Sequence, residues 1–216
     1  MLDQIKNEKK KLREEGLIKE FQKIRLLRID TEEDELVEVD NPTDLPLLFR
    51  HNKYAVFQLD TKRCIKIFTK EGYAEKEYTN LRLGADKGIS PEVYGWGEKF
   101  LVTENIGDTN ARKHVELHGI TRELTEKLIQ LLRMINEEGF MTNHALEDII
   151  ILPDGTLKVM KLKKNLISKP SFPKKIIKGL GEKAPMFLQL VFEVDKSLFE
   201  EWRLQPEFTK YDQGLE

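Results

Sequence analysis

Short apolar runs separated by turn-forming residues dominate the chain between residues 23 and 69. Asp, Asn, Pro and Thr clusters separate the runs, as is typical of antiparallel strands joined in a meander. The four runs are KIRLLRID, ELVEVD, YAVFQLD and RCIKIFT. The segment SPEVYGWGEKFLVTENIG predicts two further strands around a Gly-Trp-Gly turn. From these six candidate segments we predict a five-stranded antiparallel sheet.

A helical period replaces the alternation in three later regions. Tyr73, Glu77 and Leu81 recur four residues apart, which predicts one helix within the sheet region. In ITRELTEKLIQLLRMINEEGF, Thr121 is a suitable N-cap and Gly139 a suitable end. The apolar face of that helix comprises Leu124, Leu128, Leu131, Leu132 and Ile135. A final helix is predicted over 185–202, on the stripe Phe187, Val191, Val194, Leu198 and Trp202.

A hairpin is predicted between the second and third of these helices. The runs IIIL and LKVMKL flank Pro153-Asp154-Gly155, a sequence that favours a tight turn. The fold class is therefore α+β: an antiparallel sheet with one helix, then a mainly helical part that contains one hairpin.

These patterns divide the chain into three parts. Residues 1–22 are densely charged and predict a solvated helix or, alternatively, an arm that binds a partner. Residues 23–106 hold the sheet and its helix, and residues 107–216 form the mainly helical half. A hinge-like segment near Glu104–Gly107 joins the halves, and a cleft between two such halves is a natural place for a ligand.

The composition is that of a globular protein with balanced charge. Among 216 residues, Lys and Arg total 36, Asp and Glu total 38, and the formal net charge is −2. The chain has no overall basic excess, so its composition does not indicate nucleic acid as a partner.

The longest aliphatic run, Ile149–Leu152, is too short to span a bilayer, and MLDQIKNEKKK lacks the apolar core of a signal peptide. With Cys64 as the single cysteine, we expect a cytoplasmic protein without disulfides or a structural zinc site.

Two local features add hypotheses about ligands. His114 and His118 stand four residues apart, but Gly119 ends their segment at once, so we do not expect a metal pair there. The run from Lys161 to Lys178 is locally basic. It predicts a solvated loop or, alternatively, contact with an anionic partner such as nucleic acid or an acidic protein face.

Four motifs follow one another along the chain: the segment from Phe49 to Val56, Lys66 in RCIK, Glu77 four residues before Leu81, and the stretch GFMTNHALEDIIILPDGTLKVMKLKKN. Their order and approximate spacing resemble those of the protein kinase fold. Over residues 45–165 the chain resembles a small bacterial Ser/Thr protein kinase-like protein, with a shortened C-terminal part. The resemblance implies a two-lobed fold that binds ATP. It places Lys66 of RCIK at the strand lysine that holds the α- and β-phosphates, and Glu77 at the helix glutamate that pairs with it. Glu75 is the alternative partner.

The segment at the place of the Gly-rich loop departs from the family. Aligned on Val56, the three glycine positions of G-x-G-x-x-G-x-V hold Phe49, His51 and Tyr54. Side chains of this size crowd the volume that a triphosphate occupies, unless the loop moves away. Val56 would still pack on an adenine or fill the core.

The strand before the interlobe segment resembles the one that leads to the kinase hinge. Thr103 falls near the gatekeeper position. The backbone of Glu104 to Ile106 would contact the adenine, or would simply form an interdomain linker.

The stretch GFMTNHALEDIIILPDGTLKVMKLKKN resembles the catalytic loop with altered chemistry. Aligning the strand Ile149–Leu152 puts Asp148 at the metal-binding asparagine and Asn143 at the catalytic aspartate, while Lys161 replaces the aspartate of D-F-G. An amide cannot act as a base at neutral pH, and a lysine reverses the charge at a magnesium site. If His144 is instead the motif histidine, the fit is poorer, although an insertion could bring Glu147 or Asp148 to the cleft.

The sequence therefore predicts a pseudokinase, a binding or regulatory module without ordinary phosphoryl transfer. ATP would bind weakly, without magnesium and with the ammonium of Lys161 in the metal's place, or not at all. A protein partner is expected, and a membrane or nucleic acid is not. The alternatives are an active atypical Ser/Thr kinase or small-molecule phosphotransferase, and a two-lobed interaction protein whose cleft is filled by Phe49 and Tyr54.

Overall fold

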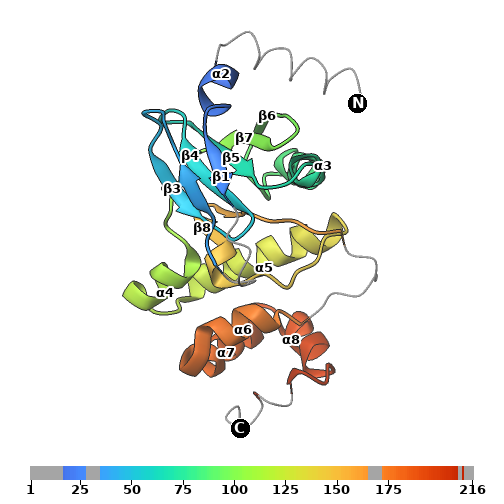
Figure 1. The fold of residues 1–216 in the computed structure, drawn as a ribbon. Helices are drawn as coiled ribbons and strands as arrows, with labels where there is room; N and C mark the ends of the chain where they lie inside the picture. The colour runs from blue at the N-terminus through green and yellow to red at the C-terminus, as the bar shows by residue number, and fades with distance from the viewer. Residues whose placement is uncertain (1–16, 28–34, 165–171, 209–210, 212–216) are drawn as a thin grey trace. The chain divides into compact units, whose positions relative to one another are not determined.

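The computed structural model describes residues 17–27, 35–164, 172–208 and 211. The chain divides into two compact units (Figure 1). The N-terminal unit takes in residues 1–86 and 91–106, and the C-terminal unit residues 87–90 and 107–216. Most of the predicted charged arm lies outside the described residues, and its described end forms helix α2 (Leu17–Phe21).

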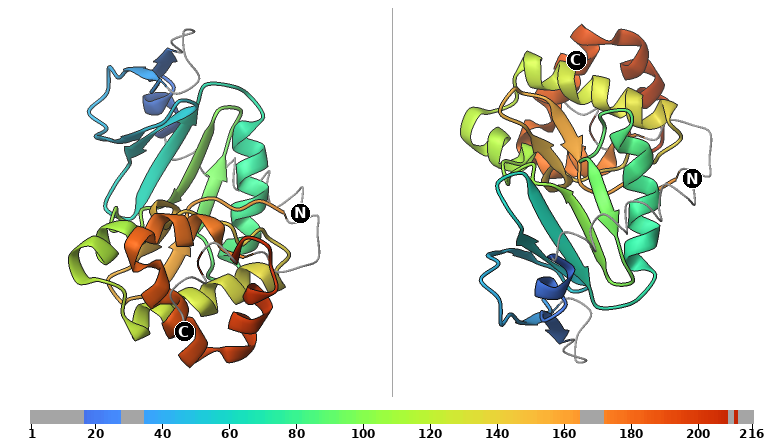
Figure 2. Two further views of the ribbon diagram at one scale, coloured as in Figure 1. Left: turned by 90° about the horizontal axis from the view of Figure 1, so that it is seen from below. Right: turned by 90° about the horizontal axis from the view of Figure 1, so that it is seen from above.

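A five-stranded antiparallel sheet forms the centre of the N-terminal unit, which confirms the α+β class. The strand order is β3-β4-β5-β7-β6. The strands are β3 (Leu47–Arg50), β4 (Tyr54–Gln58), β5 (Arg63–Phe68), β6 (Val93–Trp96) and β7 (Phe100–Glu104). Helix α3 (Tyr73–Ala85), the predicted helix, follows β5 in the chain and runs alongside the sheet (Figure 2).

The composition of this sheet corrects one prediction. The runs KIRLLRID and ELVEVD supply β1 (Arg25–Leu27) and β2 (Glu38–Asp40), but these strands pair with each other in a separate two-stranded sheet. The fifth strand of the main sheet is the edge strand β3, which the pattern did not predict. All four of its residues are exposed, so it lacks the alternation of a half-buried strand.

The two faces of the main sheet differ in chemistry. Residues directly opposite each other on antiparallel strands project to the same face, so the register shows on which face of the sheet each side chain lies. One face carries Phe57, Ile65 and Val102, which are fully buried in a cluster with Phe21 and Ile24. The opposite face carries the predicted nucleotide-binding lysine, and its surroundings are described below.

Helices and one hairpin make up the C-terminal unit. They are α4 (Ala111–His118), α5 (Arg122–Glu137), a 3₁₀ turn (Leu146–Asp148), β8 (Ile149–Ile151), β9 (Leu157–Val159), α6 (Lys174–Leu180), a second 3₁₀ turn (Gly181–Lys183), α7 (Ala184–Val194) and α8 (Lys196–Arg203). The predicted N-cap of α5 is confirmed, because Thr121 Oγ1 accepts a hydrogen bond from Leu124 N at 3.1 Å. The predicted hairpin is also confirmed, and Gly155 in its turn has a φ of +80°.

The single last helix predicted over 185–202 is wrong: it is two helices, α7 and α8, that break at Asp195. The Asp195 backbone is non-helical, with φ −149° and ψ 78°. Its carboxylate accepts a hydrogen bond from Leu198 N at 3.1 Å, which caps α8, and it also pairs with Arg133 of α5. A local cap and an ion pair thus outweigh the continuous apolar stripe.

In the described parts of the chain, no helix has the length and apolar character needed to cross a membrane.

Candidate functional site

Lys66 lies at the centre of β5, with a neighbouring strand on each side. It is directly opposite Val56 of β4 and Leu101 of β7, so all three side chains project from the same face of the sheet. The residue is only 7% exposed. Burying an ammonium group costs free energy unless an opposite charge or hydrogen bonds compensate it. Lys66 therefore requires partners inside the N-terminal unit.

Glu77 of α3 supplies the opposite charge. Its Oε1 atom accepts a hydrogen bond from Lys66 Nζ at 2.5 Å, and the carboxylate side chain is 21% exposed. Glu75, the alternative partner, is exposed. Residues two apart on a helix project in nearly opposite directions, so only one of the two can reach the sheet. The predicted ion pair is present; its role toward a nucleotide stays a prediction.

Aromatic rings enclose the remainder of the Lys66 ammonium. Nζ lies 3.8 Å from the ring centroid of Tyr54 and 5.5 Å from that of Phe68. Tyr54 is itself held by His51, whose ring stacks on it at 4.6 Å with an interplanar angle of 11°. Phe49, the third large side chain at a predicted glycine position, is 53% exposed. Of these three residues, therefore, Tyr54 is the one that contacts the lysine.

The end of β7 holds the predicted hinge residues. Thr103 is buried, and its Oγ1 atom lies 3.2 Å from Cys64 Sγ. Burial raises the pKa of the Cys64 thiol, so the thiol stays protonated there. The N–H groups of Glu104 and Asn105 already donate to Glu92 O at 2.9 Å and to Lys62 O at 2.7 Å. These two donors are engaged within the N-terminal unit, and Ile106 is buried.

Asp148 and Lys161 form an ion pair in the C-terminal unit. Asp148 ends the 3₁₀ turn before β8, and Lys161 follows β9. The hairpin brings them together, since Met160 N donates to Asp148 O at 2.9 Å. Lys161 Nζ is 3.5 Å from Asp148 Oδ1, with side chains 43% and 26% exposed. The carboxylate at this position is thus paired with an ammonium group of its own chain.

Asn143 has a structural role in the same unit. Its Oδ1 atom accepts a hydrogen bond from Lys175 N in the first turn of α6, at 2.9 Å. The amide oxygen therefore anchors the start of α6 to the loop before the 3₁₀ turn. Glu147, the other acid of this turn, pairs with the guanidinium of Arg112 on α4.

His144 is buried beside these residues. It is 7% exposed, and its Nε2 atom has no hydrogen-bond partner among the described residues. Burial lowers the pKa of His144, although the Asp148 carboxylate and a hydrogen bond with the Met141 backbone oppose this effect. The imidazole is therefore held neutral inside the unit.

This burial predicts a pH dependence of stability. The unfolded chain, with a His144 pKa near the ordinary value of 6.5, binds a proton more readily than the folded chain. The contribution of neutral His144 to stability is thus present above that value and falls as the pH drops toward the lowered folded pKa. We expect His144→Gln to flatten the decline in the free energy of unfolding below about pH 6.5, measured by urea denaturation. The exposed His118→Gln variant serves as the control, and an equal flattening in both would contradict the prediction.

The histidine pair on α4 has no third metal-ligating residue beside it among the residues that the structure describes. The rings of His114 and His118 lie 4.7 Å apart, and burial together with His118 lowers the pKa of His114. Over the described ranges of the chain, no group of three or more His, Cys, Asp or Glu residues could hold a metal ion.

The sequence did not predict two of the contacts at these sites. The sequence suggested that Tyr54 would crowd a phosphate, but gave no sign that its ring lies on the ammonium of Lys66. That contact follows from register, since Tyr54 is opposite Phe68 and is thereby the diagonal neighbour of Lys66. The bond from Lys175 to Asn143 joins residues 32 apart and had no local signal.

Comparison of the chain with models of known protein families, and with curated proteins, finds no match.

Proposed function

We propose that this protein is a kinase-fold module that has lost phosphoryl transfer and works by binding, as a regulatory pseudokinase in the cytoplasm. The order of its elements supports the fold assignment. A five-stranded antiparallel sheet has its helix between the third and fourth strands of the chain order β3 to β7, and a helix, loop and hairpin follow in the C-terminal unit. The ion pair between Lys66 and Glu77 is the one that the resemblance implies.

The pair of Asp148 and Lys161 is the observation that carries the loss of catalysis. In kinases an asparagine and an aspartate at these two places hold the magnesium ions that neutralise the transferred phosphate. Here the second place carries an ammonium group, which repels a dication and already neutralises Asp148 at 3.5 Å. A magnesium ion would have to break this pair and then lie beside a positive charge.

The position of the catalytic base supports the same conclusion. Asn143 cannot accept a proton at neutral pH, and its amide oxygen is occupied by Lys175 N. The alternative of an active phosphotransferase needs Asp148 or Glu147 as the acid. Both carboxylates are paired, with Lys161 and Arg112 respectively, so the alternative gains no support from this region.

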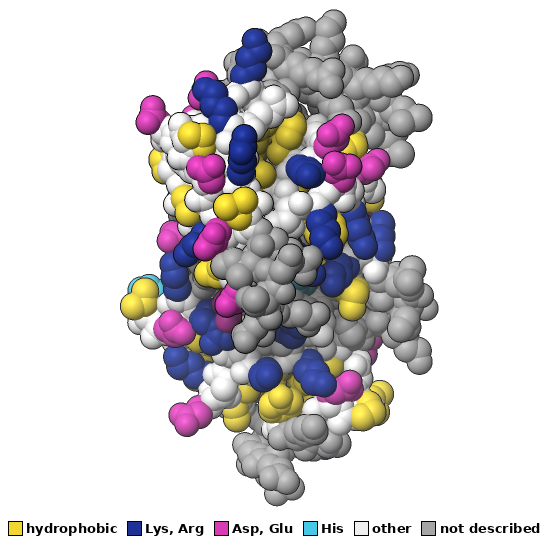
Figure 3. All heavy atoms as spheres, in the orientation of Figure 1, with side chains coloured by type: hydrophobic (Ala, Val, Ile, Leu, Met, Phe, Trp, Pro, Cys, Tyr) yellow, Lys and Arg dark blue, Asp and Glu magenta, His cyan; other side chains and the backbone are white. Residues whose placement is uncertain are grey.

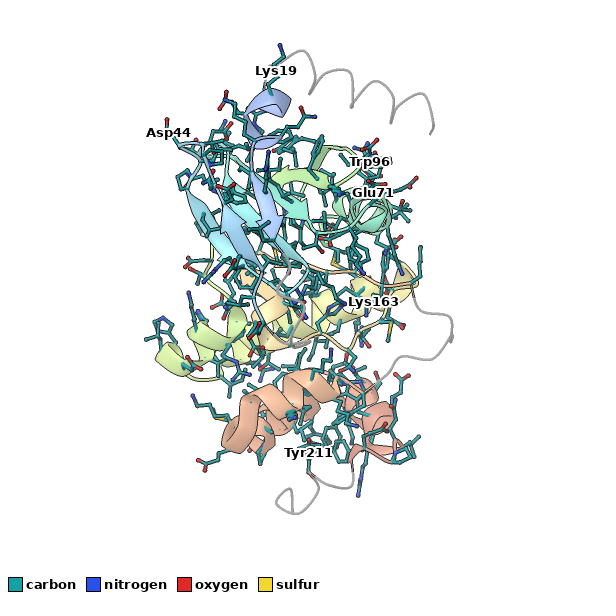
Figure 4. The ribbon with its side chains drawn as sticks, viewed as in Figure 1. Lys19, Asp44, Glu71, Trp96, Lys163 and Tyr211 are labelled. Atoms are coloured by element: carbon teal, nitrogen blue, oxygen red, sulfur yellow. The ribbon has the colours of Figure 1, made fainter. Side chains whose placement is uncertain are left out.

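A protein partner with an acidic surface is part of the proposal. Lys and Arg side chains are scattered over the face shown in Figure 3, and five exposed lysines lie on α6 and on the segment after β9, where Lys163 lies (Figure 4). They are Lys163, Lys164, Lys174, Lys175 and Lys178. Exposed lysines of this kind attract an anionic partner, although residues 165–171 of the basic run lie outside the described residues.

Transfer from radiolabelled ATP to a generic protein substrate tests the proposal. We expect no transfer above the level of Lys66→Ala in magnesium or manganese, and no contribution of magnesium to any thermal stabilisation by ATP. The reason is the positive charge of Lys161 at the metal position. Magnesium-dependent stabilisation, together with turnover that Lys66→Ala abolishes, would show an active kinase instead.

A charge-restoring variant sharpens this test. Lys161→Asp removes the ammonium and places two carboxylates together at the end of the hairpin, a donor set that suits Mg²⁺. We expect this variant, and not Lys158→Asp on the neighbouring strand β9, to gain magnesium-dependent thermal stabilisation. If Lys161→Asp gains nothing, Lys161 is not what excludes the metal.

A further inference from the structure

The ammonium group of Lys66 is closed off inside the N-terminal unit. Glu77 Oε1 lies at 2.5 Å, the Tyr54 ring centroid at 3.8 Å and the Phe68 ring centroid at 5.5 Å. Together these groups leave the lysine 7% exposed. A strand lysine that served a nucleotide would need one N–H direction open toward the phosphates.

The Tyr54 ring takes the space that a phosphate needs. A phosphate oxygen bonded to Nζ would lie about 2.8 Å from it, as in other charge-assisted hydrogen bonds. A ring centroid at 3.8 Å puts aromatic carbons at van der Waals distance from the same ammonium, so ring and phosphate cannot share that side. Glu77 Oε1 accepts a hydrogen bond from Nζ in another direction. The Glu77 carboxylate and the Tyr54 ring therefore lie where a phosphate ligand would contact the lysine.

Several contacts hold the ring in this position. Tyr54 is 8% exposed, His51 stacks on one of its faces, and Phe68 lies 5.9 Å away across the β4–β5 pair. Tyr54 is paired with Phe68 of β5, and the preceding residue is held as well, because Lys53 O accepts a hydrogen bond from Thr69 N at 3.0 Å. Moving the ring away therefore means rotating the side chain rather than shifting the strand. A glycine at this position would leave the ammonium uncovered.

We propose that Tyr54 keeps nucleotides off Lys66, so that phosphates reach the lysine only when the ring has rotated away. The inference rests on the proposed function, because it takes Lys66 as the phosphate-binding lysine of a kinase fold. Tyr54 is here a positioning residue that acts through Lys66. A single side chain, that of Tyr54, thus excludes nucleotide from the N-terminal unit.

Two measurements on the full chain test this role. The first is acylation of Lys66 by a small amine-reactive ester, followed by peptide mass spectrometry, which reports access without any nucleotide. The second is binding of a fluorescent ATP analogue without magnesium. We expect Tyr54→Ala to raise both the acylation rate and the nucleotide affinity by about tenfold or more, and Tyr54→Phe, which keeps the ring, to change neither.

The matched controls separate the causes. Tyr94→Ala removes an exposed tyrosine from β6 of the same sheet and should have no effect on either measurement. Adding Lys66→Ala to Tyr54→Ala should cancel the gain in nucleotide affinity. Should Tyr54→Ala fail to fold by circular dichroism, Tyr54→Val replaces it, because valine suits a strand but is too short to cover the ammonium, and gains in the same direction are expected.

The outcomes distinguish this inference from the proposed function. Faster acylation with a gain in nucleotide binding supports both. Faster acylation without nucleotide binding supports the covering role of Tyr54 and overturns Lys66 as a nucleotide-binding residue. Unchanged acylation in folded Tyr54→Ala or Tyr54→Val overturns the inference, whatever the transfer assay shows about catalysis.

Discussion

Replacing Glu77 by alanine is expected to destabilise the N-terminal unit by about 3 kcal/mol. The change removes the carboxylate 2.5 Å from the Lys66 ammonium, a group that is only 7% exposed in the intact protein, and leaves it without its opposite charge. The Tyr54 ring still stabilises the Lys66 ammonium in part. We therefore expect a loss in the free energy of unfolding at the low end of the range for breaking a buried ion pair. Hydrogen exchange with mass spectrometry measures the loss in peptides of β4 and β5 separately from the C-terminal unit.

Two further variants identify the unpaired charge as the cause. Glu75→Ala removes an exposed carboxylate from the same helix and should change stability by no more than about 0.5 kcal/mol. A Lys66→Met/Glu77→Leu double variant removes both charges and should recover most of the loss, because apolar side chains of similar volume replace the pair. Equal losses for Glu77→Ala and Glu75→Ala would mean that the pair contributes nothing.

The sequence pattern around Lys66 predicted that this lysine is covered and paired. RCIKIF is apolar on both faces of its strand, so a lysine within it must be covered and must have a partner. The choice of Glu77 as that partner came from the resemblance to the kinase fold, which left Glu75 as the alternative. The same kind of local signal predicted the N-cap Thr121 and the hairpin turn, because each depends on residues close in the chain.

Other features depended on contacts that the chain makes at a distance. Strand β3 is exposed throughout, so only its pairing with β4 defines it. The break at Asp195 depends on an ion pair with Arg133, 62 residues earlier, in addition to a local cap. The closure of Lys66 by Tyr54 depends on the β4–β5 register, which a one-residue slip would undo.

The charged groups at the candidate sites share one property. Lys66 pairs with Glu77, Asp148 with Lys161, and Glu147 with Arg112. A site preorganised for a triphosphate and metal would leave charges directed at the missing ligand, at a cost in stability. Here each charge is neutralised within its own unit. None of these three pairs needs a ligand to balance its charges, which agrees with the proposed role of a binding module.

Replacing Trp202 by alanine is expected to have an effect of similar or greater size on the C-terminal unit, a loss of about 3–5 kcal/mol. The indole is 2% exposed and lies against Phe172 in an edge-on arrangement with ring centroids 5.9 Å apart. Phe187 of α7 packs on it at 6.4 Å. Removing the ring leaves a cavity where α7, α8 and the segment before α6 meet, and rigid aromatic neighbours cannot close it.

The distribution of this loss along the chain decides whether the two units are stabilised separately. Hydrogen exchange should rise in peptides of α5 to α8, while the amides of β4 and β5 and the acylation rate of Lys66 stay unchanged. Met186→Ala on α7, where the side chain is 54% exposed, should change neither unit by more than about 0.5 kcal/mol. If Trp202→Ala also opens β4 and β5, the units unfold together, and the closure of Lys66 then depends on the C-terminal unit as well as on Tyr54.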